Sequence, residues 1–503
     1  AWVMGCLAIV VACAVIFALA AAAAGIWAVT SSQDDMAPVI AEFETVGETP
    51  EASPAPDEQV APADGVEQAG RPDDETLSPV PTLPAEDSVA EEPAAEEAVA
   101  EEAIAEEGAP DEIIDPHAAE RAAIEANVAA IRDLAPKEEV SPTSLTPAEL
   151  RLRLEEDLLE EYDPEQARQD VIALSAFDFM PADFELHSFV LDLLTEQIAG
   201  YYDPETDEFV IVSDDEEFDT LEQVAHAHEY VHALQDQYYD LELLDDDELD
   251  SEAAFALQAL VEGEATFVQT LFMVGGYFDT GHLLELLEDS LTVDTAVLDS
   301  APPILARELE FPYLTGLEFV QALHAQGGFE AVEAAWSDLP QSTEQILHPQ
   351  RYLAGDAPQI VSLAPLTGTL GSGWELVQED TLGEFYLREY LAQQLDGDSV
   401  EQAATGWGGD RYAVDWNEAE QTPVRLLRLV WDTAADAQEF AGSYPQYPER
   451  LFGDAAPADV EGGRCWSGVD VLCLFAAGDE TLIVRAPDLG TAARVISVQK
   501  AGG

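Results

Sequence analysis

Positive charge is scarce in this chain of 503 residues, because lysine and arginine together number only 18, and Lys137 and Lys500 are its two lysines. Aspartate and glutamate number 104, which gives a formal net charge of −86. A nucleic-acid binder needs a basic face that displaces counterions from phosphate, and this composition cannot build one. Binding to a bare acidic membrane surface is disfavoured for the same reason.

Cysteine is scarce as well. Cys6 and Cys13 lie in an apolar run, and Cys465 and Cys473 bracket a strand-like stretch near the C-terminus. No histidine or second cysteine pair lies near the latter two, which disfavours a zinc ribbon. Two cysteines eight residues apart around a turn predict a local disulfide in an oxidising compartment, with two buried free thiols as the alternative.

Charged residues are missing altogether from residues 1–29. At 1.5 Å per residue this apolar run is long enough to cross a hydrocarbon core of about 30 Å, so we expect a transmembrane helix over residues 1–30. A cleaved signal peptide would have a basic start and a shorter apolar stretch of about 7 to 15 residues. Val10–Cys13 loosely resembles a bacterial lipobox, but the apolar run continues beyond it, which disfavours lipidation.

Residues 31–115 contain 26 acidic residues and a single basic one, Arg71. Low hydrophobicity and uniform charge predict a disordered tether rich in Pro, Ala and Glu. Because no Lys or Arg follows the apolar run closely, we expect the body to lie outside the cytoplasm. The rest of the chain keeps a charge of −61. Salt near 1 M shortens the Debye length to about 3 Å, so a salt-loving (halophilic) source is one hypothesis and a general solubility bias is the other.

The remaining chain has the composition of a folded body, since 47% of all residues are hydrophobic. Thr146–Glu149 is a capping box with Pro at the first helical position, and Tyr201–Val212 has the pattern of a β-hairpin. We predict the α+β class: a mainly helical domain over residues 116–356 with a small antiparallel sheet, and a smaller α+β domain over residues 357–503.

The segment 221–237 has neither Gly nor Pro and predicts a helix. His228 and His232 are four residues apart, so they project from one face about 6 Å apart, where two imidazoles can bind one zinc ion. Glu229 lies beside them, in the position from which HExxH peptidases take a proton from zinc-bound water. His226 points about 200° away from His228, and we expect it to be structural or exposed.

A catalytic zinc needs a third protein ligand and an open position for water. The next predicted helix, from Ser251 to about Val274, carries Glu262 and Glu264 in apolar surroundings, where an unpaired carboxylate costs several kcal/mol. The two acids differ by about 200° around the helix, so only one of them can face the histidines. We choose Glu262, because small neighbours such as Gly263 allow close approach.

The metzincin pattern HExxHxxGxxH is excluded, because Gln235 and Tyr238 occupy its Gly and His positions. Over Leu191–Thr270 the chain resembles the gluzincins, zinc metallopeptidases with HExxH on one helix and a glutamate on the next, and Glu262–Ala265 resembles their EGxA segment. It is most similar to uncharacterised bacterial putative metallopeptidases with an HELTHALQDQ-type helix. The resemblance implies a zincin-like fold whose edge strand binds extended substrate, with Phe209–Val212 as the candidate edge.

Other polar residues are secondary candidates. Asp236 lies four residues after His232. It either accepts the N–H of the His232 ring nitrogen that does not bind zinc, or it serves as a cap or surface residue. Tyr313, in a segment 311–316 expected to open a helix, and His348 are candidate donors to an oxyanion, with ordinary packing as the alternative. The insert between the two motif helices contains Asp245–Glu248, which is either a calcium loop or a solvated acidic loop.

The sequence therefore predicts a membrane-anchored, extracytoplasmic zinc metallopeptidase. Zn²⁺ is held by His228, His232 and Glu262, and Glu229 activates the water that attacks a peptide carbonyl. The expected partners are a peptide or protein substrate and the membrane through the N-terminal helix, with no nucleic acid, and the oligomeric state is open. The alternative is a catalytically silent envelope protein that uses the same fold for binding or scaffolding.

Overall fold

The computed structural model describes residues 116–502, except 214–217, 246–248, 291, 292, 294, 367, 454 and 455, and it leaves out the side chains of 157–161, 245, 289, 290 and 502. The predicted membrane helix, the tether and most of the acidic loop lie outside the described residues. Within the described part of the chain, no helix is both long and apolar enough to span a membrane. Residues 117–503 fall in one compact unit, so the boundary expected at residue 356 stays a prediction.

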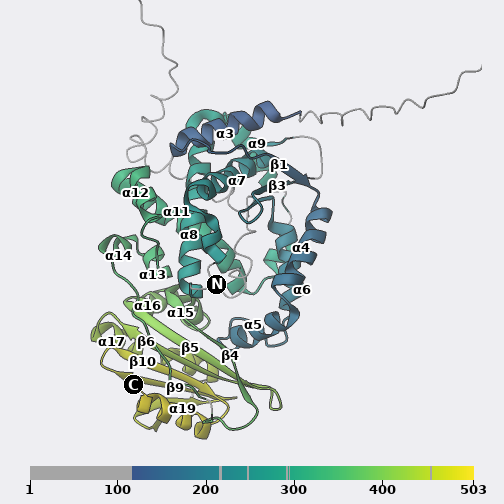
Figure 1. Ribbon diagram of the computed structural model, residues 1–503. Helices are drawn as coiled ribbons and strands as arrows, with labels where there is room; N and C mark the ends of the chain where they lie inside the picture. The colour runs from purple at the N-terminus through teal and green to yellow at the C-terminus, as the bar shows by residue number, and fades with distance from the viewer. Residues whose placement is uncertain are drawn as a thin grey trace, which may run out of the picture. The chain divides into compact units, whose positions relative to one another are not determined.

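Helices dominate the described chain up to residue 356 (Figure 1). Several begin at an aspartate whose carboxylate accepts backbone N–H bonds of the first turn, which also places negative charge at the positive end of the helix dipole. The helices are α3 (Ala118–Arg132), α4 (Pro147–Glu161), α5 (Pro164–Ala176), α6 (Leu186–Gln197), α7 (Thr220–Tyr239), α8 (Ser251–Phe272), α9 (Thr280–Ser290), α10 (Ala296–Asp299), α11 (Pro303–Gly327), α12 (Phe329–Ala335), α13 (Thr343–Leu347) and α14 (Pro349–Ala354), with a 3-10 turn η1 (Leu241–Asp245) and a π-helical turn η2 (Met273–Tyr277).

Two expectations about helix starts have opposite outcomes. The capping box is confirmed, because the Thr146 N–H donates to Glu149 Oε2 at 2.9 Å and the Glu149 N–H donates to Thr146 Oγ1 at 3.3 Å. The helix start expected at residue 311 is wrong, since α11 begins at Pro303 and continues through Pro312. Proline is favoured in the first turn of a helix, but tertiary packing can also keep one in the interior.

The small sheet has the strand order β1-β3-β2. The predicted hairpin is present as β2 (Gly200–Asp203) and β3 (Glu208–Val212), which pair antiparallel. A further strand, β1 (Pro142–Leu145), pairs parallel with β3, so the sheet is mixed rather than antiparallel. The proposed substrate edge at Phe209–Val212 is therefore wrong: β3 is the central strand, and β2 is the edge strand beside α7.

Helix α7 is buried between this sheet and the other helices. Its Val224 and Val231 share a core with Phe209 of β3 and with Ile124 and Val128 of α3, and none of these side chains is exposed to solvent. Burial on several sides removes most of the surface of a 20-residue helix from water and fixes the direction of its polar face. The histidines of α7 are thus carried on a rigid element.

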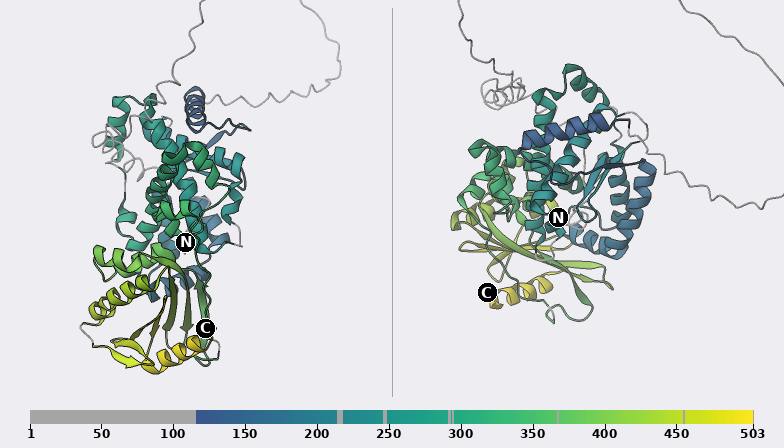
Figure 2. Two further views of the ribbon diagram at one scale, coloured as in Figure 1. Left: turned by 90° about the vertical axis from the view of Figure 1, so that its left-hand side faces the viewer. Right: turned by 45° about the horizontal axis from the view of Figure 1, so that its top comes forward.

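The C-terminal part of the described chain is built on a seven-stranded antiparallel sheet with the order β4-β5-β6-β10-β9-β8-β7 (Figures 1 and 2). Helices cover the sheet on both faces. The strands are β4 (Trp374–Asp380), β5 (Trp407–Asn417), β6 (Thr422–Trp431), β7 (Ala458–Val460), β8 (Gly463–Ser467), β9 (Val471–Ala477) and β10 (Glu480–Ala486), and the helices are α15 (Gly383–Ala392), α16 (Gly397–Ala404), α17 (Ala434–Ser443), α18 (Gln446–Phe452) and α19 (Leu489–Gly502).

Successive residues of β6 point to opposite faces of this sheet, as strand geometry requires. Leu426 packs with Val495 and Ile496 of α19 on one face. On the other face Trp431 meets Phe440 of α17 at a ring distance of 4.9 Å. Both faces are therefore buried, which accounts for the apolar residues that β6 places on each face, such as Leu426, Leu427 and Leu429.

The predicted disulfide is present between Cys465 of β8 and Cys473 of β9. The two residues are direct partners across the strand pair, with their Cα atoms 4.0 Å apart. Such a cross-strand position brings the two Cβ atoms close enough for a bridge.

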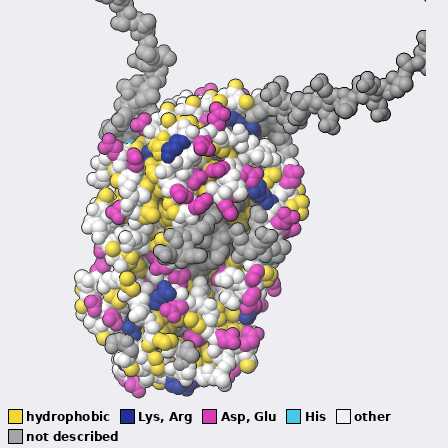
Figure 3. Space-filling view, in the orientation of Figure 1, with side chains coloured by type: hydrophobic (Ala, Val, Ile, Leu, Met, Phe, Trp, Pro, Cys, Tyr) yellow, Lys and Arg dark blue, Asp and Glu magenta, His cyan; other side chains and the backbone are white. Residues whose placement is uncertain are grey.

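Acidic side chains are spread over the described surface. On the face drawn in Figure 3, Asp and Glu are scattered over both the helical and the sheet parts, with few Lys and Arg among them. The negative charge of the chain is therefore not confined to the predicted tether, as the charge of −61 outside residues 31–115 requires.

Candidate metal centre

The two histidines of the HExxH segment project from the buried face of α7. The helix starts at Asp219, whose carboxylate accepts the Glu222 N–H at 2.9 Å. The rings of His228 and His232 lie 4.8 Å apart and nearly perpendicular, and their Nε2 atoms are 3.1 Å apart. Both Nε2 atoms thus face the same point, as the spacing of four residues predicts.

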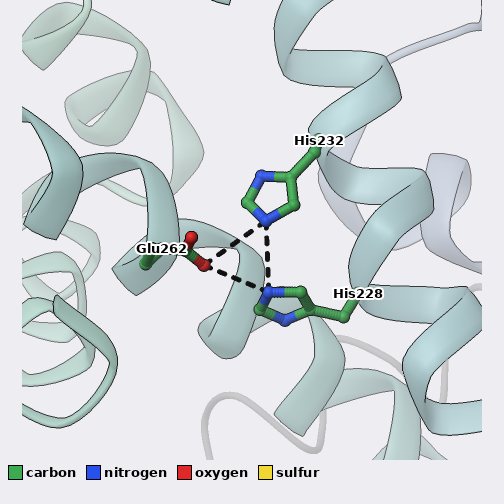
Figure 4. Close-up of side chains that lie close together, drawn as sticks. All are labelled: His228, His232 and Glu262. Atoms are coloured by element: carbon green, nitrogen blue, oxygen red, sulfur yellow. Dashed lines mark hydrogen bonds and ion pairs between the residues drawn. The ribbon is translucent and has the colours of Figure 1, made fainter. Parts of the chain in front are cut away.

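Helix α8 supplies the acid that faces this point (Figure 4). Glu262 Oε2 lies 3.2 Å from His228 Nε2 and 3.4 Å from His232 Nε2. The side chains of His228, His232 and Glu262 are only 2, 9 and 6% exposed. The three residues form a group of potential metal ligands, with one ligand atom from each lying within 4.8 Å of the others.

The donor set and its dimensions fit a zinc ion. Two imidazole nitrogens and one carboxylate oxygen are the ligands found in many catalytic zinc sites. Bonds of about 2.0–2.1 Å to a tetrahedral zinc place the ligand atoms roughly 3.3–3.4 Å apart. The observed separations of 3.1, 3.2 and 3.4 Å lie close to those edges.

The charges of the three residues are coupled when no metal is bound. Burial works to lower the pKa of His232, but the charge and hydrogen bond of Glu262, the charge of Glu229 and the hydrogen bond of Gln235 together outweigh it and raise this pKa to about 9. Burial lowers the pKa of His228. Burial works to raise the pKa of Glu262, but the positive charge on His232 and the hydrogen bonds to both histidines together lower it below the usual value. A metal cation bound between the three residues would interact with the Glu262 carboxylate in place of the proton on His232.

Glu229 is separate from the three converging ligands. Its side chain is 1% exposed, and burial raises its pKa to about 8. Its Oε1 has no hydrogen-bond partner among the residues that the structure describes. Gly200 of β2 lies against it, since a Cβ on this glycine would lie 3.3 Å from Glu229 Cγ and 2.9 Å from Val210 O. The missing side chain at Gly200 lets the edge strand lie directly on this part of α7.

The second acid of α8, Glu264, points away from the histidines and has its own cation. Its side chain is fully buried and forms an ion pair with the guanidinium of Arg132 from α3, which is 2% exposed. Trp336 Nε1 donates to Glu264 Oε2 at 2.7 Å. Sequence reasoning missed both partners, because a buried acid indicates only that a donor or a cation lies beside it and not which one.

The hydrogen-bond partner of His232 is Gln235, so the suggestion that Asp236 holds this role is wrong. His232 Nδ1 lies 2.8 Å from Gln235 Oε1. Asp236 instead accepts the Tyr202 hydroxyl at 2.9 Å and the Leu241 N–H at 2.8 Å. Gln235 lies three residues after His232, so both side chains are on the same face of α7, and the glutamine side chain is long enough to contact the ring.

The imidazole of His228 also has a side-chain amide beside it, that of Gln269. His228 Nδ1 and Gln269 Oε1 are both buried without a hydrogen-bond partner among the described residues. Gln269 nonetheless opposes the effect of burial on the pKa of His228. Its Nε2 donates to Val224 O at 3.3 Å. Glutamines therefore lie behind both histidines.

Tyr313 and His348 have different outcomes. The Tyr313 ring stacks on the ring of His228 at 6.0 Å and is 1% exposed, which places it beside the centre. His348 Nε2 instead lies 3.1 Å from Glu384 Oε1. His348 follows α13, which contacts the N-terminal end of α8 through Glu252, and ten residues of helix, about 15 Å, separate Glu252 from Glu262. The structure does not bring His348 to the centre.

Gly263, the small residue beside Glu262, does not bring α8 close to the histidines of α7 as expected. A Cβ on Gly263 would overlap the backbone of Gly316, so this glycine allows α8 to cross α11, not α7. Glu262 and not Glu264 lies beside the histidines, and Glu264 pairs with Arg132 instead. His226 is structural as expected, since it is fully buried and its Nε2 lies 3.1 Å from Glu125 Oε1.

Comparison with known proteins adds one finding about the sheet. Residues 373–496 match a family described as a domain of unknown function, DUF8575. The matched range contains the strands from β4 to β10 and does not include α7 or α8. No curated protein and no solved structure matches the chain. The chemistry of the metal centre is therefore argued from its geometry.

Proposed function

We propose that the chain is a zinc-dependent metallopeptidase in which His228, His232 and Glu262 bind the metal and Glu229 is the general base. The observation that carries the proposal is the convergence of two imidazole nitrogens and one carboxylate oxygen at separations of 3.1 to 3.4 Å inside a buried helix pair. A zinc ion, when bound, supplies Lewis acidity and lowers the pKa of water to about 7.

Glu229 has the position of the proton carrier. Its buried Oε1, which makes no hydrogen bond within the described residues, is available to accept a proton from the attacking water. The same carboxyl then returns that proton to the amine nitrogen as the C–N bond of the peptide breaks. Its burial keeps bulk water from competing for this exchange.

Substrate orientation is assigned to the edge strand β2 in place of β3. In the described three-stranded sheet, β2 is hydrogen-bonded on one side only. An extended peptide that adds to its open side runs past Glu229, because Gly200 of β2 lies against this residue. The hydroxyl of Tyr313, whose ring stacks on His228, is the candidate donor to the oxyanion.

The proposed location follows from sequence alone. We infer a single membrane helix over residues 1–30 and an extracytoplasmic body tethered by residues 31–115, which lie outside the described part of the chain. A disulfide between Cys465 and Cys473 agrees with an oxidising compartment. Protease protection of the full chain in membrane vesicles of known orientation tests this assignment.

The test of function combines metal analysis with an activity screen. The purified chain is expected to bind one zinc ion and to cleave members of a peptide library read by mass spectrometry. Glu229→Gln should keep the zinc and lose turnover by at least the roughly 10²- to 10⁴-fold that a general base contributes.

The matched control is Glu222→Gln, which changes a carboxylate near the start of the same helix. Wild-type turnover in Glu229→Gln would refute the assigned base. A wild-type protein that holds zinc but cleaves no peptide would support the silent binding or scaffold protein instead. A protein that binds no divalent metal would exclude the metallopeptidase proposal.

A further inference from the structure

Gln235 bridges the metal centre and the buried ion pair behind it. Its side chain is 1% exposed. Its Oε1 lies 2.8 Å from His232 Nδ1. Its Nε2 donates to the carbonyl of Val261 at 3.0 Å and to Glu264 Oε2 at 3.2 Å. Each end of the amide therefore faces a different part of the site.

The partners of Gln235 determine which way its amide points. A backbone carbonyl and a carboxylate are both acceptors, so the amide NH₂ must face Val261 and Glu264. The amide oxygen is then left for the imidazole, and only an Nδ1–H of His232 can donate to it. With the hydrogen on Nδ1, the lone pair of the neutral ring lies on Nε2, which is the atom that faces Glu262 and His228.

The anchor of this chain of hydrogen bonds is rigid. Arg132 pairs with Glu264 and also donates to the Tyr239 hydroxyl at 2.8 Å. The Tyr239 ring stacks on Trp336 at 4.4 Å with an angle of 7° between the planes. Trp336 in turn donates to Glu264. These groups come from α3, α7 and α8 and from the end of α12, so the carboxylate of Glu264 cannot turn without disturbing several elements.

We propose that Gln235 is a positioning residue that fixes His232 as the Nδ1–H tautomer, and that the Arg132–Glu264 pair serves to orient Gln235. This inference rests on the proposed function, because it assigns His232 Nε2 to the metal. The two acids of α8 thus have separate tasks: Glu262 faces the cation, and Glu264 orients the amide that prepares one of the other ligands.

The first variant is Gln235→Leu, which keeps the approximate size of the side chain and removes all three of its hydrogen bonds. Zinc affinity, measured by competition with a chromophoric chelator, should fall about 10- to 100-fold, the range seen when outer partners of ligand histidines are removed. The visible spectrum of the cobalt-substituted protein should change as well, since the ligand orientation changes.

Gln499→Leu is the matched control. Gln499 is a fully buried glutamine that bonds the backbone of Ala364 through both ends of its amide, and it lies in α19 of the sheet part. This variant is expected to lose stability and to keep the zinc affinity and cobalt spectrum of the wild type. Wild-type affinity and spectrum in Gln235→Leu would overturn the inference.

A charge-swap pair tests the same contact if Gln235→Leu does not fold. Gln235→Glu places two carboxylates at the 3.2 Å contact with residue 264 and should weaken zinc binding. Adding Glu264→Gln restores a donor on one side and an acceptor on the other, so the double variant should recover part of the affinity. Equal affinity in the single and double variants would contradict the proposed coupling.

These measurements separate this inference from the proposed function. A wild-type chain that binds zinc but cleaves no peptide still permits every comparison, because affinity and spectrum are the readouts. A wild-type chain that binds no metal would overturn both proposals.

Discussion

The crossing of α7 and α8 and the C-terminal sheet both bury polar side chains, but they satisfy them differently. In the sheet part, Arg425 donates to the Ala176 carbonyl at 2.9 Å, and Asp410 accepts the N–H groups of Leu382 and Gly383 at 2.7 and 2.9 Å. Where α7 crosses α8, the Nε2 atoms of His228 and His232 and the Oε2 atom of Glu262 face one another, and all three can carry lone pairs. These two buried groups of the sheet part thus meet complementary partners, whereas a shared proton or a cation would be needed to satisfy the facing atoms of the helix crossing.

Buried polarity alone therefore does not mark a functional site. Glu264 and Asp410 are as buried as Glu262, yet each has neighbouring donors that satisfy its oxygens. The convergence of like acceptors distinguishes Glu262 from both. A proton shared with His232 offsets the repulsion in the metal-free protein, and a divalent cation would offset it further.

Removing the ligand carboxylate is the change expected to have the largest effect. Glu262→Gln should lower zinc affinity by more than the roughly 100-fold that loss of an outer partner costs, because an amide is a weaker ligand than a carboxylate. The measurement is competition with a chelator of known affinity.

Asp410→Asn is the corresponding change in the sheet. It should cost about 1–3 kcal/mol of unfolding free energy, because an amide NH₂ would face the donors that now bond this carboxylate, and zinc affinity should stay the same. If both variants lost zinc equally, the contrast between the two regions would be broken.

The close crossing of α8 and α11 is the next most sensitive feature. Gly263→Ala should lower the unfolding free energy by about 1–3 kcal/mol, because its Cβ would overlap the backbone of Gly316 and force the helices apart. Zinc affinity should fall with it, since Glu262 is the adjacent residue.

Gly275→Ala is the matched glycine control, because a Cβ there meets nothing within 4 Å. Urea unfolding and zinc titration of both variants check the prediction. A Gly263→Ala protein with wild-type stability would show that the crossing tolerates a side chain.

Loss of the disulfide should affect the sheet part and leave the metal centre alone. The bridge closes a loop of eight residues, so replacing Cys465 and Cys473 by serine should cost about 2 kcal/mol of stability. Urea unfolding measures the loss, and chelator competition should give an unchanged zinc affinity. A parallel loss of zinc would mean that the sheet region supports the metal centre.

The smallest and most general effect concerns salt. The charge of −61 outside residues 31–115 implies self-repulsion, which shrinks as the Debye length falls from about 10 Å at 0.1 M to about 3 Å at 1 M salt. The melting temperature should therefore rise as potassium chloride is raised from about 0.1 to 1 M. A melting temperature that fell or stayed constant as salt increased would contradict the interpretation of a halophilic source.

Features set by local spacing were predictable from the sequence. The helix over residues 221–237, the hairpin and the capping box depend on neighbours a few positions apart, and the structure has all three. That only one of Glu262 and Glu264 can face the histidines followed from the rotation of about 100° per residue around a helix. The shared face of His228 and His232 followed from the same geometry.

Features that depend on distant partners could not be predicted in this way. The parallel pairing of β1 with β3 makes β2 the edge, and no pattern within the hairpin indicates that third strand. Arg132 and Trp336 come from positions 132 residues before and 72 residues after Glu264. The choice of Gln235 over Asp236 depended on which side of the helix meets α8.

The sequence was enough to show which residue types were available for a zinc centre and on which helical faces they lie, because a helix repeats every 3.6 residues whatever surrounds it. Packing between elements set how close α8 approaches its neighbouring helices and which of its acids pairs with the buried Arg132. It also decided which amide lies behind each histidine. Those outcomes depend on packing between segments far apart in the chain, where each contact is selected by the shape and charge of both partners.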